Sequence, residues 1–177
     1  PKDEPETTLD IVYEFLTDHG YRNGDAVTLR CFRQDFYKYV GTHYKRLHDE
    51  SIDDEIIRWL GSTGRAKKAS VNTITQMKAL MRSKPILVEV DVEPPVLFDG
   101  INHTPAKKFI PFLNGLLDIE QYLANGSMDL KPHTPEFFST YCLPFKFDPN
   151  ATCATYEKVA NASFNNPEER GLWEEIM

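Results

Sequence analysis

The sequence lacks the features of membrane, secreted and disulfide-bonded proteins. No run approaches the roughly 18 consecutive apolar residues of a membrane span. The first residues, PKDEPETT, carry neither the basic nor the apolar region of a secretory signal. The few cysteines never form C-x-x-C, which favours reduced thiols over a disulfide framework or a zinc site. We therefore expect a cytoplasmic protein in which Cys31, Cys142 and Cys153 are buried or inert.

Catalytic signatures are also missing. There is no glycine-rich phosphate loop of the G-x-x-x-x-G-K type, no H-E-x-x-H and no paired acidic motif, and no serine has the context of a nucleophile elbow. No catalytic residue and no metal ligand is predicted. The alternative is a standalone hydrolase using His103, His133 and Asp118, which requires the fold to bring these three side chains into one polar pocket.

Acidic residues are absent from residues 58–88, although the whole chain has a formal net charge of −7. The cations of this stretch, which we call the basic segment, are Arg58, Arg65, Lys67, Lys68, Lys78, Arg82 and Lys84. A basic surface on an acidic protein can bind phosphates by counterion release while the rest of the chain repels nucleic acid. We predict a weak, positioned contact with single-stranded or template DNA. The alternative is a solvated helix face beside a mobile loop.

What the chain does contain is typical of a globular protein: 41% hydrophobic and 12% aromatic residues argue against disorder. Apolar spacing and caps predict four amphipathic helices, at residues 8–19, 51–60, 70–83 and 152–164. Ser51 and Asp54 form a capping-box pattern for the second helix, and Ser70 is the expected cap of the third. The second and third helices could pack as a helical hairpin.

Residues 26–47 are predicted to form a three-stranded antiparallel meander. Its basic and aromatic residues are interleaved: Arg30, Phe32, Arg33, Phe36, Tyr37, Lys38, Tyr39, Tyr44, Lys45 and Arg46. Such residues could stack unpaired bases and hold a nucleic-acid backbone. The alternative is that the aromatic residues form a sheet face that closes a core.

The stretch from Phe109 to Thr152 is the predicted scaffold of the fold. A strand over residues 108–112, positive φ angles at Asn114 and Gly115, and a return strand LLDI predict a hairpin. A second turn is expected at residues 125–126, and Thr134 is expected to cap a brief helical turn. Upstream, residues 86–104 are predicted to be an irregular connection with at most a short strand at ILVEV.

The predicted fold is therefore α+β, mainly helical with a small antiparallel meander and hairpins. We expect residues 1–90 to hold the first helix, the meander and the helical pair, and residues 91–177 to hold the hairpin scaffold and the C-terminal helices, packed as one compact domain. A further helix pattern opens at Asn166 and should continue past Met177, so we expect the chain to be a piece of a longer polypeptide.

Three blocks of the sequence carry a family resemblance: FYKYVGTHYKRLHDESIDDEIIRWL, FLNGLLDI and LKPHTPEFFSTYCLPFKFDPNATC. They are similar to the linker domain of phage- and plasmid-type DNA primase-helicases, found also in the poxvirus primase-helicase, which precedes a superfamily 3 helicase. The residue types of that pattern occur at Asn114, Gly115, Asp118, His133, Pro135, Thr140, Leu143, Pro144, Asp148, Ala151 and Cys153. Two features depart from the pattern: Ala154 replaces a common proline, and the interval between Asp118 and Leu130 is longer.

The resemblance implies a non-catalytic linker or collar in a DNA replication protein of a phage, plasmid or other mobile element in a bacterial or archaeal cell. Its partners would be template DNA, the adjoining primase and helicase domains, and further copies in an oligomer. The fragment itself would need no cofactor, and the parent helicase would use ATP and Mg²⁺. An alternative without DNA contact is a pure protein-interaction module.

Overall fold

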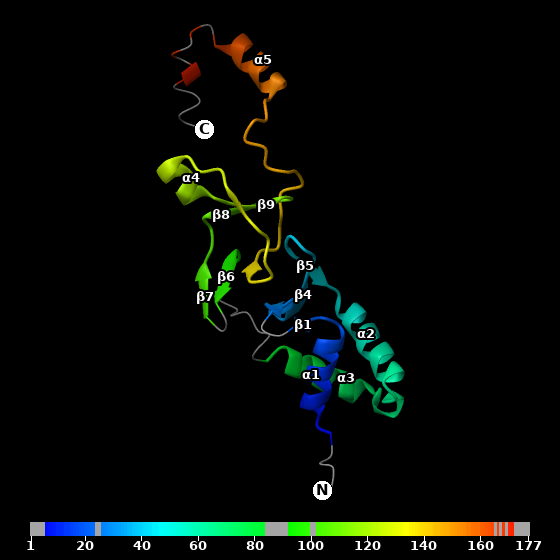
Figure 1. The fold of residues 1–177 in the computed structure, drawn as a ribbon. Helices are drawn as coiled ribbons and strands as arrows, with labels where there is room; N and C mark the ends of the chain where they lie inside the picture. Colours follow the sequence, from blue (N-terminus) through cyan, green and yellow to red (C-terminus); the bar gives the residue numbers. More distant parts are fainter. Residues whose placement is uncertain are drawn as a thin grey trace. The chain divides into compact units, whose positions relative to one another are not determined.

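The computed structural model describes residues 6–23, 26–83, 92–99, 102–164, 166, 168, 170 and 171. Among these residues, five α-helices accompany small antiparallel sheets, which confirms the predicted α+β class (Figure 1). Residues 1–147 form one compact unit and residues 148–177 a second; the predicted division at residue 90 stays a prediction. No helix among the described residues is long and apolar enough to cross a membrane.

Helix α1 (Thr8–Asp18) begins at a capping box. Thr7 Oγ1 accepts from the Asp10 backbone N–H at 3.2 Å, and the Thr7 backbone N–H donates to the Asp10 carboxylate at 2.9 Å. One face of the helix is buried: Ile11, Val12, Phe15 and Leu16. The first predicted helix and its amphipathic character are therefore confirmed.

The helical part continues with α2 (Asp49–Ser62), the 3₁₀ turn η1 (Ala66–Lys68) and α3 (Val71–Met81). The predicted capping box at Ser51 is wrong, because α2 begins at Asp49 with His48 as a cap residue that makes no side-chain bond. Acidic residues in a first turn interact favourably with the positive end of a helix, which stabilises this earlier start. Ser70 caps α3 as predicted, and Val71, the first residue of this helix, is 82% exposed.

Three strands form the predicted meander: β3 (Leu29–Phe32), β4 (Asp35–Tyr39) and β5 (Tyr44–Leu47), paired antiparallel in that order. Arg33 and Gln34, both with positive φ, make the tight turn between β3 and β4. A small hairpin of β1 (Arg22–Asn23) and β2 (Ala26–Val27) precedes them.

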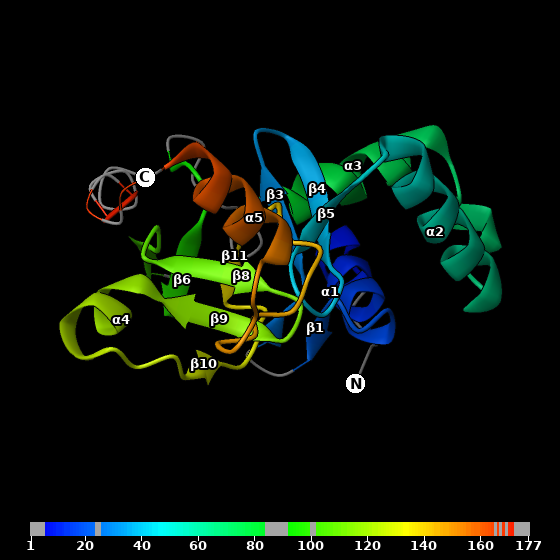
Figure 2. The same cartoon turned by 90° about the horizontal axis from the view of Figure 1, so that it is seen from above.

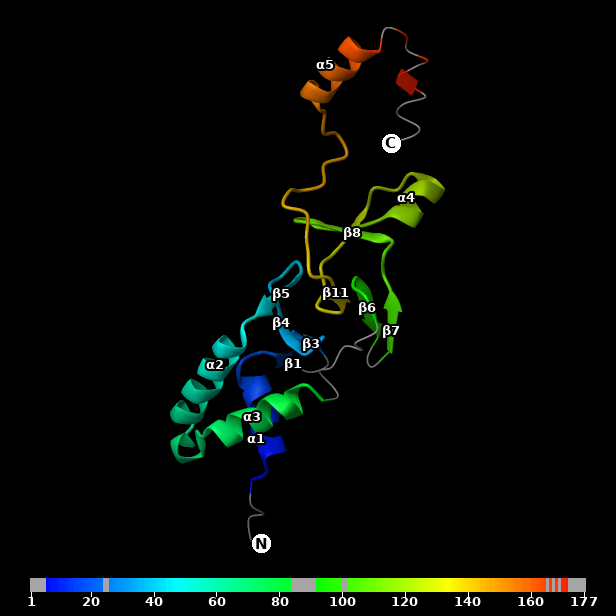
Figure 3. The same ribbon diagram turned by 180° about the vertical axis from the view of Figure 1, so that it is seen from behind.

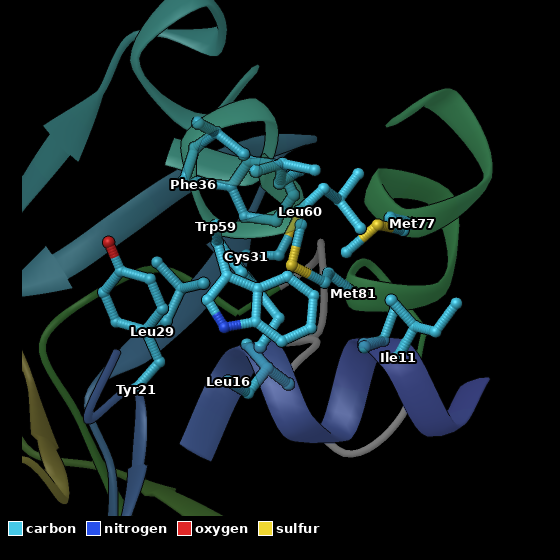
Figure 4. Packing of buried hydrophobic residues seen from close by; sticks show 14 residues of the cluster. Ile11, Leu16, Tyr21, Leu29, Cys31, Phe36, Trp59, Leu60, Met77 and Met81 are labelled. Atoms are coloured by element: carbon cyan, nitrogen blue, oxygen red, sulfur yellow. The ribbon is translucent and has the colours of Figure 1, made fainter. Parts of the chain in front are cut away.

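Both faces of the meander are covered. On one face the helices α1, α2 and α3 close the first core, in which Trp59, Met77 and Met81 lie near Cys31 and Phe36 of the sheet (Figure 4). The other face closes a second core, made of Phe32, Tyr44, Val96, Phe98 and Phe138. The aromatic residues at the centre of the meander are thus core residues, and the suggestion that they stack bases is wrong for them.

Two further three-stranded sheets follow. β6 (Val96–Asp99), β7 (Asn102–Pro105) and β11 (Phe137–Phe138) pair in the order β11-β6-β7, and β8 (Phe109–Phe112), β9 (Gly115–Asp118) and β10 (Leu130–Lys131) in the order β10-β9-β8. Figure 2 shows α4 (Ile119–Asn125) directly after β9. In Figure 3, as in Figure 1, α1–α3 and β6, β7 and β11 lie on different sides of the meander.

The predicted hairpin over residues 108–118 is confirmed, with three corrections. Of its turn residues only Gly115 has a positive φ, and Asn114 does not. Gly126, expected in a second turn, is the left-handed C-cap of α4. Thr134 does cap a turn, since its Oγ1 accepts from the Glu136 N–H at 3.3 Å, but the turn ends before Phe137 and Phe138, which form a strand. The strand suggested at ILVEV lies outside the described residues.

The second unit contains α5 (Ala154–Ser163), close to the predicted bounds. Ala160 is buried, whereas Val159 is 59% exposed. The Asn166 side chain accepts from the backbone N–H of Glu168 at 2.9 Å, as an N-cap would. Most of the residues that would continue this predicted helix lie outside the described residues.

All three cysteines are free. Cys31 is buried, and burial raises the pKa of its thiol. Cys142 is partly buried, and Cys153 is exposed. Burial is therefore confirmed for Cys31, and for the exposed Cys153 an inert thiol stays a prediction.

Candidate nucleic-acid interface

Arg65, at the centre of the basic segment, is held by two glutamates near the start of the chain. Its guanidinium donates to Glu6 Oε1 at 3.0 Å and to Glu14 Oε2 at 2.6 Å, and it lies 5.2 Å from the centre of the Trp59 ring. Lys68 Nζ donates to Glu6 Oε2 at 2.6 Å. Hydrogen bonds from Arg65 and then Lys68 lower the pKa of Glu6 to about 2. A DNA phosphate would have to displace these carboxylates to reach Arg65 or Lys68.

Lys78 and Arg82 on α3 are also paired. Lys78 Nζ lies 2.7 Å from Asp53 Oδ1 and 3.7 Å from Asp49 Oδ2. Arg82 donates to Asp49 Oδ1 at 3.2 Å and to the carbonyl oxygen of Gln34 at 3.1 Å. These contacts tie α3 to α2 and to the β3–β4 turn, so both cations contribute to the packing of the helical part.

Arg58 and Lys67 are different, because both are exposed and neither has a carboxylate within salt-bridge distance among the described residues. Arg58 Nε donates only to the backbone carbonyl of Asp54, at 3.2 Å. Lys84, the last cation predicted for the contact, lies outside the described residues. Within the part of the segment that is described, Arg58 and Lys67 are the cations most available to a phosphate.

The three arginines of the meander already have partners within the protein. Arg30 is 5% exposed, and its guanidinium lies 4.1 Å from the centre of the Phe98 ring, where a cation–π contact stabilises it. Arg33 pairs with Glu93, and Arg46 with Asp35 at 2.8 Å. These arginines therefore serve the fold.

The motif residues of the scaffold bond mainly to the protein backbone. Asn114 Nδ2 donates to the Phe147 carbonyl at 2.9 Å, and its Oδ1 accepts from the Phe147 N–H at 2.8 Å. His133 Nε2 lies 2.7 Å from the carbonyl oxygen of Phe112 and donates to it. The Pro135 carbonyl accepts from the buried Tyr44 hydroxyl at 2.5 Å, and burial raises the pKa of Tyr44 to about 12. Residues 130–147, which we call the strap, are thus joined to the meander and to the β8–β9 hairpin.

Gly115 and Asp118 fix the two ends of β9. A Cβ at Gly115 would come within 2.8 Å of the Lys131 carbonyl oxygen, and its φ is +151°, so this close approach of β10 requires glycine. Asp118 caps α4 by accepting from the Gln121 N–H at 3.3 Å. It also pairs with Lys131 at 3.0 Å, which lowers the pKa of Asp118.

Three further motif residues, Leu143, Pro144 and Asp148, lie at the end of the strap and directly after it. Pro144 lies between Leu143, whose N–H donates to the Pro111 carbonyl at 2.8 Å, and Phe145, whose carbonyl accepts from the Leu113 N–H at 3.1 Å. Asp148 Oδ1 accepts from the Asn150 N–H at 2.9 Å and forms a turn at the start of the second unit.

The hydrolase alternative fails on geometry. His133 bonds to the carbonyl of Phe112, which pairs with Gly115 at the turn end of the β8–β9 hairpin. Asp118 lies at the other end of β9, three residues after Gly115, which corresponds to about 10 Å at 3.3 Å per strand residue. His103 lies opposite Phe98 in another sheet. The three side chains do not share a pocket, and no group of three potential metal ligands occurs among the described residues.

Sequence reasoning missed the acids that pair with four cations of the basic segment: Glu6, Glu14, Asp49 and Asp53. They come from other elements, so spacing within residues 58–88 gives no sign of them. The available signal is global: with 27 acidic and 20 basic residues, most cations of a compact fold can find a carboxylate.

A protein-family model described as D5 N terminal like matches residues 15–165. The match runs from within α1 to just beyond α5 and includes every motif residue of the scaffold. No curated protein matches the chain.

Proposed function

Because this chain belongs to the D5 N terminal like family, which is found in phage and poxvirus primase-helicase proteins, we propose that it is the non-catalytic linker or collar of a DNA replication primase-helicase. In this role it connects a primase or polymerase module to a ring-forming helicase, which brings the ATP and Mg²⁺ chemistry. The linker assists the assembly of the ring and guides single-stranded DNA between the modules.

The observation that carries this proposal is the family match together with the contacts of the motif residues inside it. Asn114 and His133 bond backbone groups of other segments, and Asp118 is occupied by Lys131 and by the start of α4. Side chains used in this way stabilise a scaffold. A domain whose characteristic residues are structural suits a mechanical role.

The DNA part of the proposal depends on the cations that are not already paired. Phosphate contacts gain free energy by releasing counterions, but a cation that must first break an ion pair gains less. Arg58 and Lys67 are exposed and have no carboxylate partner among the described residues. Arg65, Lys68, Lys78 and Arg82 are balanced by the carboxylates of their ion pairs and so contribute less to phosphate binding.

The test replaces Arg58 and Lys67 with glutamine in the full-length protein. The matched control replaces Lys107 and Lys146, two exposed lysines outside the basic segment, and so makes the same change in charge. We expect weaker single-strand binding with a log–log salt slope reduced by roughly 1.4, since each contact contributes about 0.7. DNA-independent ATP hydrolysis should stay unchanged while unwinding slows.

Equal single-strand binding and unwinding in the two double variants would contradict the role of these cations in DNA guidance. If the full-length protein is an oligomer, and neither double variant changes its DNA binding or unwinding, the linker is a protein-interaction module alone. Substitution of Arg65 or Lys68 is a poorer test, because it would also break the network with Glu6.

A further inference from the structure

We propose that Lys38 and Lys45, side by side on the meander, form a phosphate-binding pair for single-stranded DNA outside the basic segment. This inference rests on the proposed function for the identity of its ligand. The observation behind it is a pair of like charges held side by side by the sheet, although several neighbouring cations, such as Arg46 and Lys78, form ion pairs.

The register of the meander places the two lysines directly opposite each other. Lys38 of β4 is the cross-strand partner of Lys45 in β5 and of Leu29 in β3. The next row on this face is Cys31, Phe36 and Leu47, which α1, α2 and α3 cover. Side chains opposite each other in an antiparallel pair lie about 5 Å apart at Cβ. A buried apolar row is thus followed by a row that ends in two lysines side by side.

No carboxylate neutralises this pair among the described residues. Arg46, the neighbour of Lys45, pairs with Asp35 at 2.8 Å, and Lys78 pairs with Asp53 at 2.7 Å. Like charges directly opposite each other on a sheet are destabilising. In a chain with an excess of acids, two adjacent lysines left without a carboxylate indicate a charge kept for a ligand.

The surroundings orient Lys38. Its Nζ lies 5.0 Å from the centre of the Tyr21 ring, which positions the ammonium by a cation–π contact; it donates no hydrogen bond to any described residue. The hydroxyl of Tyr21 donates to Glu55, and Glu55 forms no ion pair with either lysine. Lys45 is exposed. Two lysines whose Cβ atoms lie about 5 Å apart can reach one backbone phosphate or two successive ones.

A nucleic-acid backbone fits this site better than an acidic peptide because both cations are lysines and neither is an arginine. Lys38 and Lys45 offer point charges without the flat, bidentate geometry that arginine provides for carboxylates. The nearby arginines of the meander, which have that geometry, already bind carboxylates or an aromatic ring.

The experiment measures single-strand binding of the purified full-length protein by fluorescence anisotropy, with a labelled oligo-dT, over a salt series. Lys38→Gln with Lys45→Gln should reduce the salt slope by roughly 1.4 and the affinity roughly 25-fold at about 0.1 M salt. The double variant of Lys107 and Lys146 is the control of equal charge. The midpoint of thermal unfolding should stay the same or rise, because a repulsion is removed; a structural pair would lower it.

The outcomes separate this inference from the proposed function. If the Lys38 and Lys45 variant binds like the wild type while the Arg58 and Lys67 variant is weakened, the pair is not a DNA site and the proposed function stands. If the wild type binds no single strand at all, both the DNA part of the function and this inference fail. Poly-glutamate binding with equal affinity and equal dependence on both lysines would replace DNA by an acidic protein as the ligand.

Discussion

The side-chain amide of Asn114 bonds both backbone groups of Phe147, donating through Nδ2 at 2.9 Å and accepting through Oδ1 at 2.8 Å. An amide that pairs in this way imitates one residue of a neighbouring strand. It joins the turn of the β8–β9 hairpin to the last residue of the first unit. Asn114, which precedes Gly115 in the turn, thus makes these two hydrogen bonds and does not adopt a left-handed backbone conformation.

Asn114→Ala should destabilise the first unit by about 1–2 kcal/mol, because two hydrogen bonds of about 0.5–1.5 kcal/mol each are lost. The free energy of unfolding from urea denaturation measures this change. Asn102→Ala, at an exposed asparagine on β7, is the control and should have little effect. Equal effects of the two substitutions would show that the bond to Phe147 contributes nothing.

Gly115→Ala should cost about 1–3 kcal/mol from overpacking, because its Cβ would lie 2.8 Å from Lys131 O and 2.9 Å from Leu130 Cβ. Gly61, within α2, has an ordinary backbone and open space where an added methyl group would lie, so Gly61→Ala should stabilise by about 0.5–1 kcal/mol. In urea denaturation, the free energy of unfolding should therefore fall for Gly115→Ala and rise for Gly61→Ala. A neutral Gly115→Ala would mean that β10 moves freely away from β9.

Acid should destabilise the helical part through Glu6. Its pKa is lowered from 4.5 to about 2 by Arg65 and Lys68, so the folded state binds this proton less readily than the unfolded state. The stabilisation is therefore complete above pH 4.5 and is lost as the pH falls toward 2. Glu6→Gln should flatten the pH dependence of urea unfolding in this window. An unchanged acid sensitivity would show that the ion pairs with Arg65 and Lys68 do not persist in solution.

The local elements could largely be predicted from the sequence, because their determinants are neighbours along the chain. Ser70 as a cap and the periodic apolar residues before Gly20 define α3 and α1. Helix α4 was missed although Asp118 and Gln121 have the spacing of a capping pair, because LLDI resembles a strand continuing into a turn.

The charge pairing of the candidate site could not be predicted, because it depends on contacts between distant segments. Arg65 and Glu6 are 59 residues apart, and only the packing of α1 against the helices that follow brings them together. The covering of both meander faces is likewise a tertiary result, since interleaved aromatic and basic residues suit either a surface or a core.

Asp118→Asn combined with His133→Gln in the full-length protein is the decisive test of whether the motif residues are architectural. Two quantities are measured for the variant and the wild type: the midpoint of thermal unfolding, and the rate of unwinding per folded molecule at a temperature below that midpoint. We expect a lower midpoint, since the contacts with Lys131 and the Phe112 carbonyl are weakened, and an unchanged rate. An unchanged midpoint with unwinding abolished would contradict the architectural role.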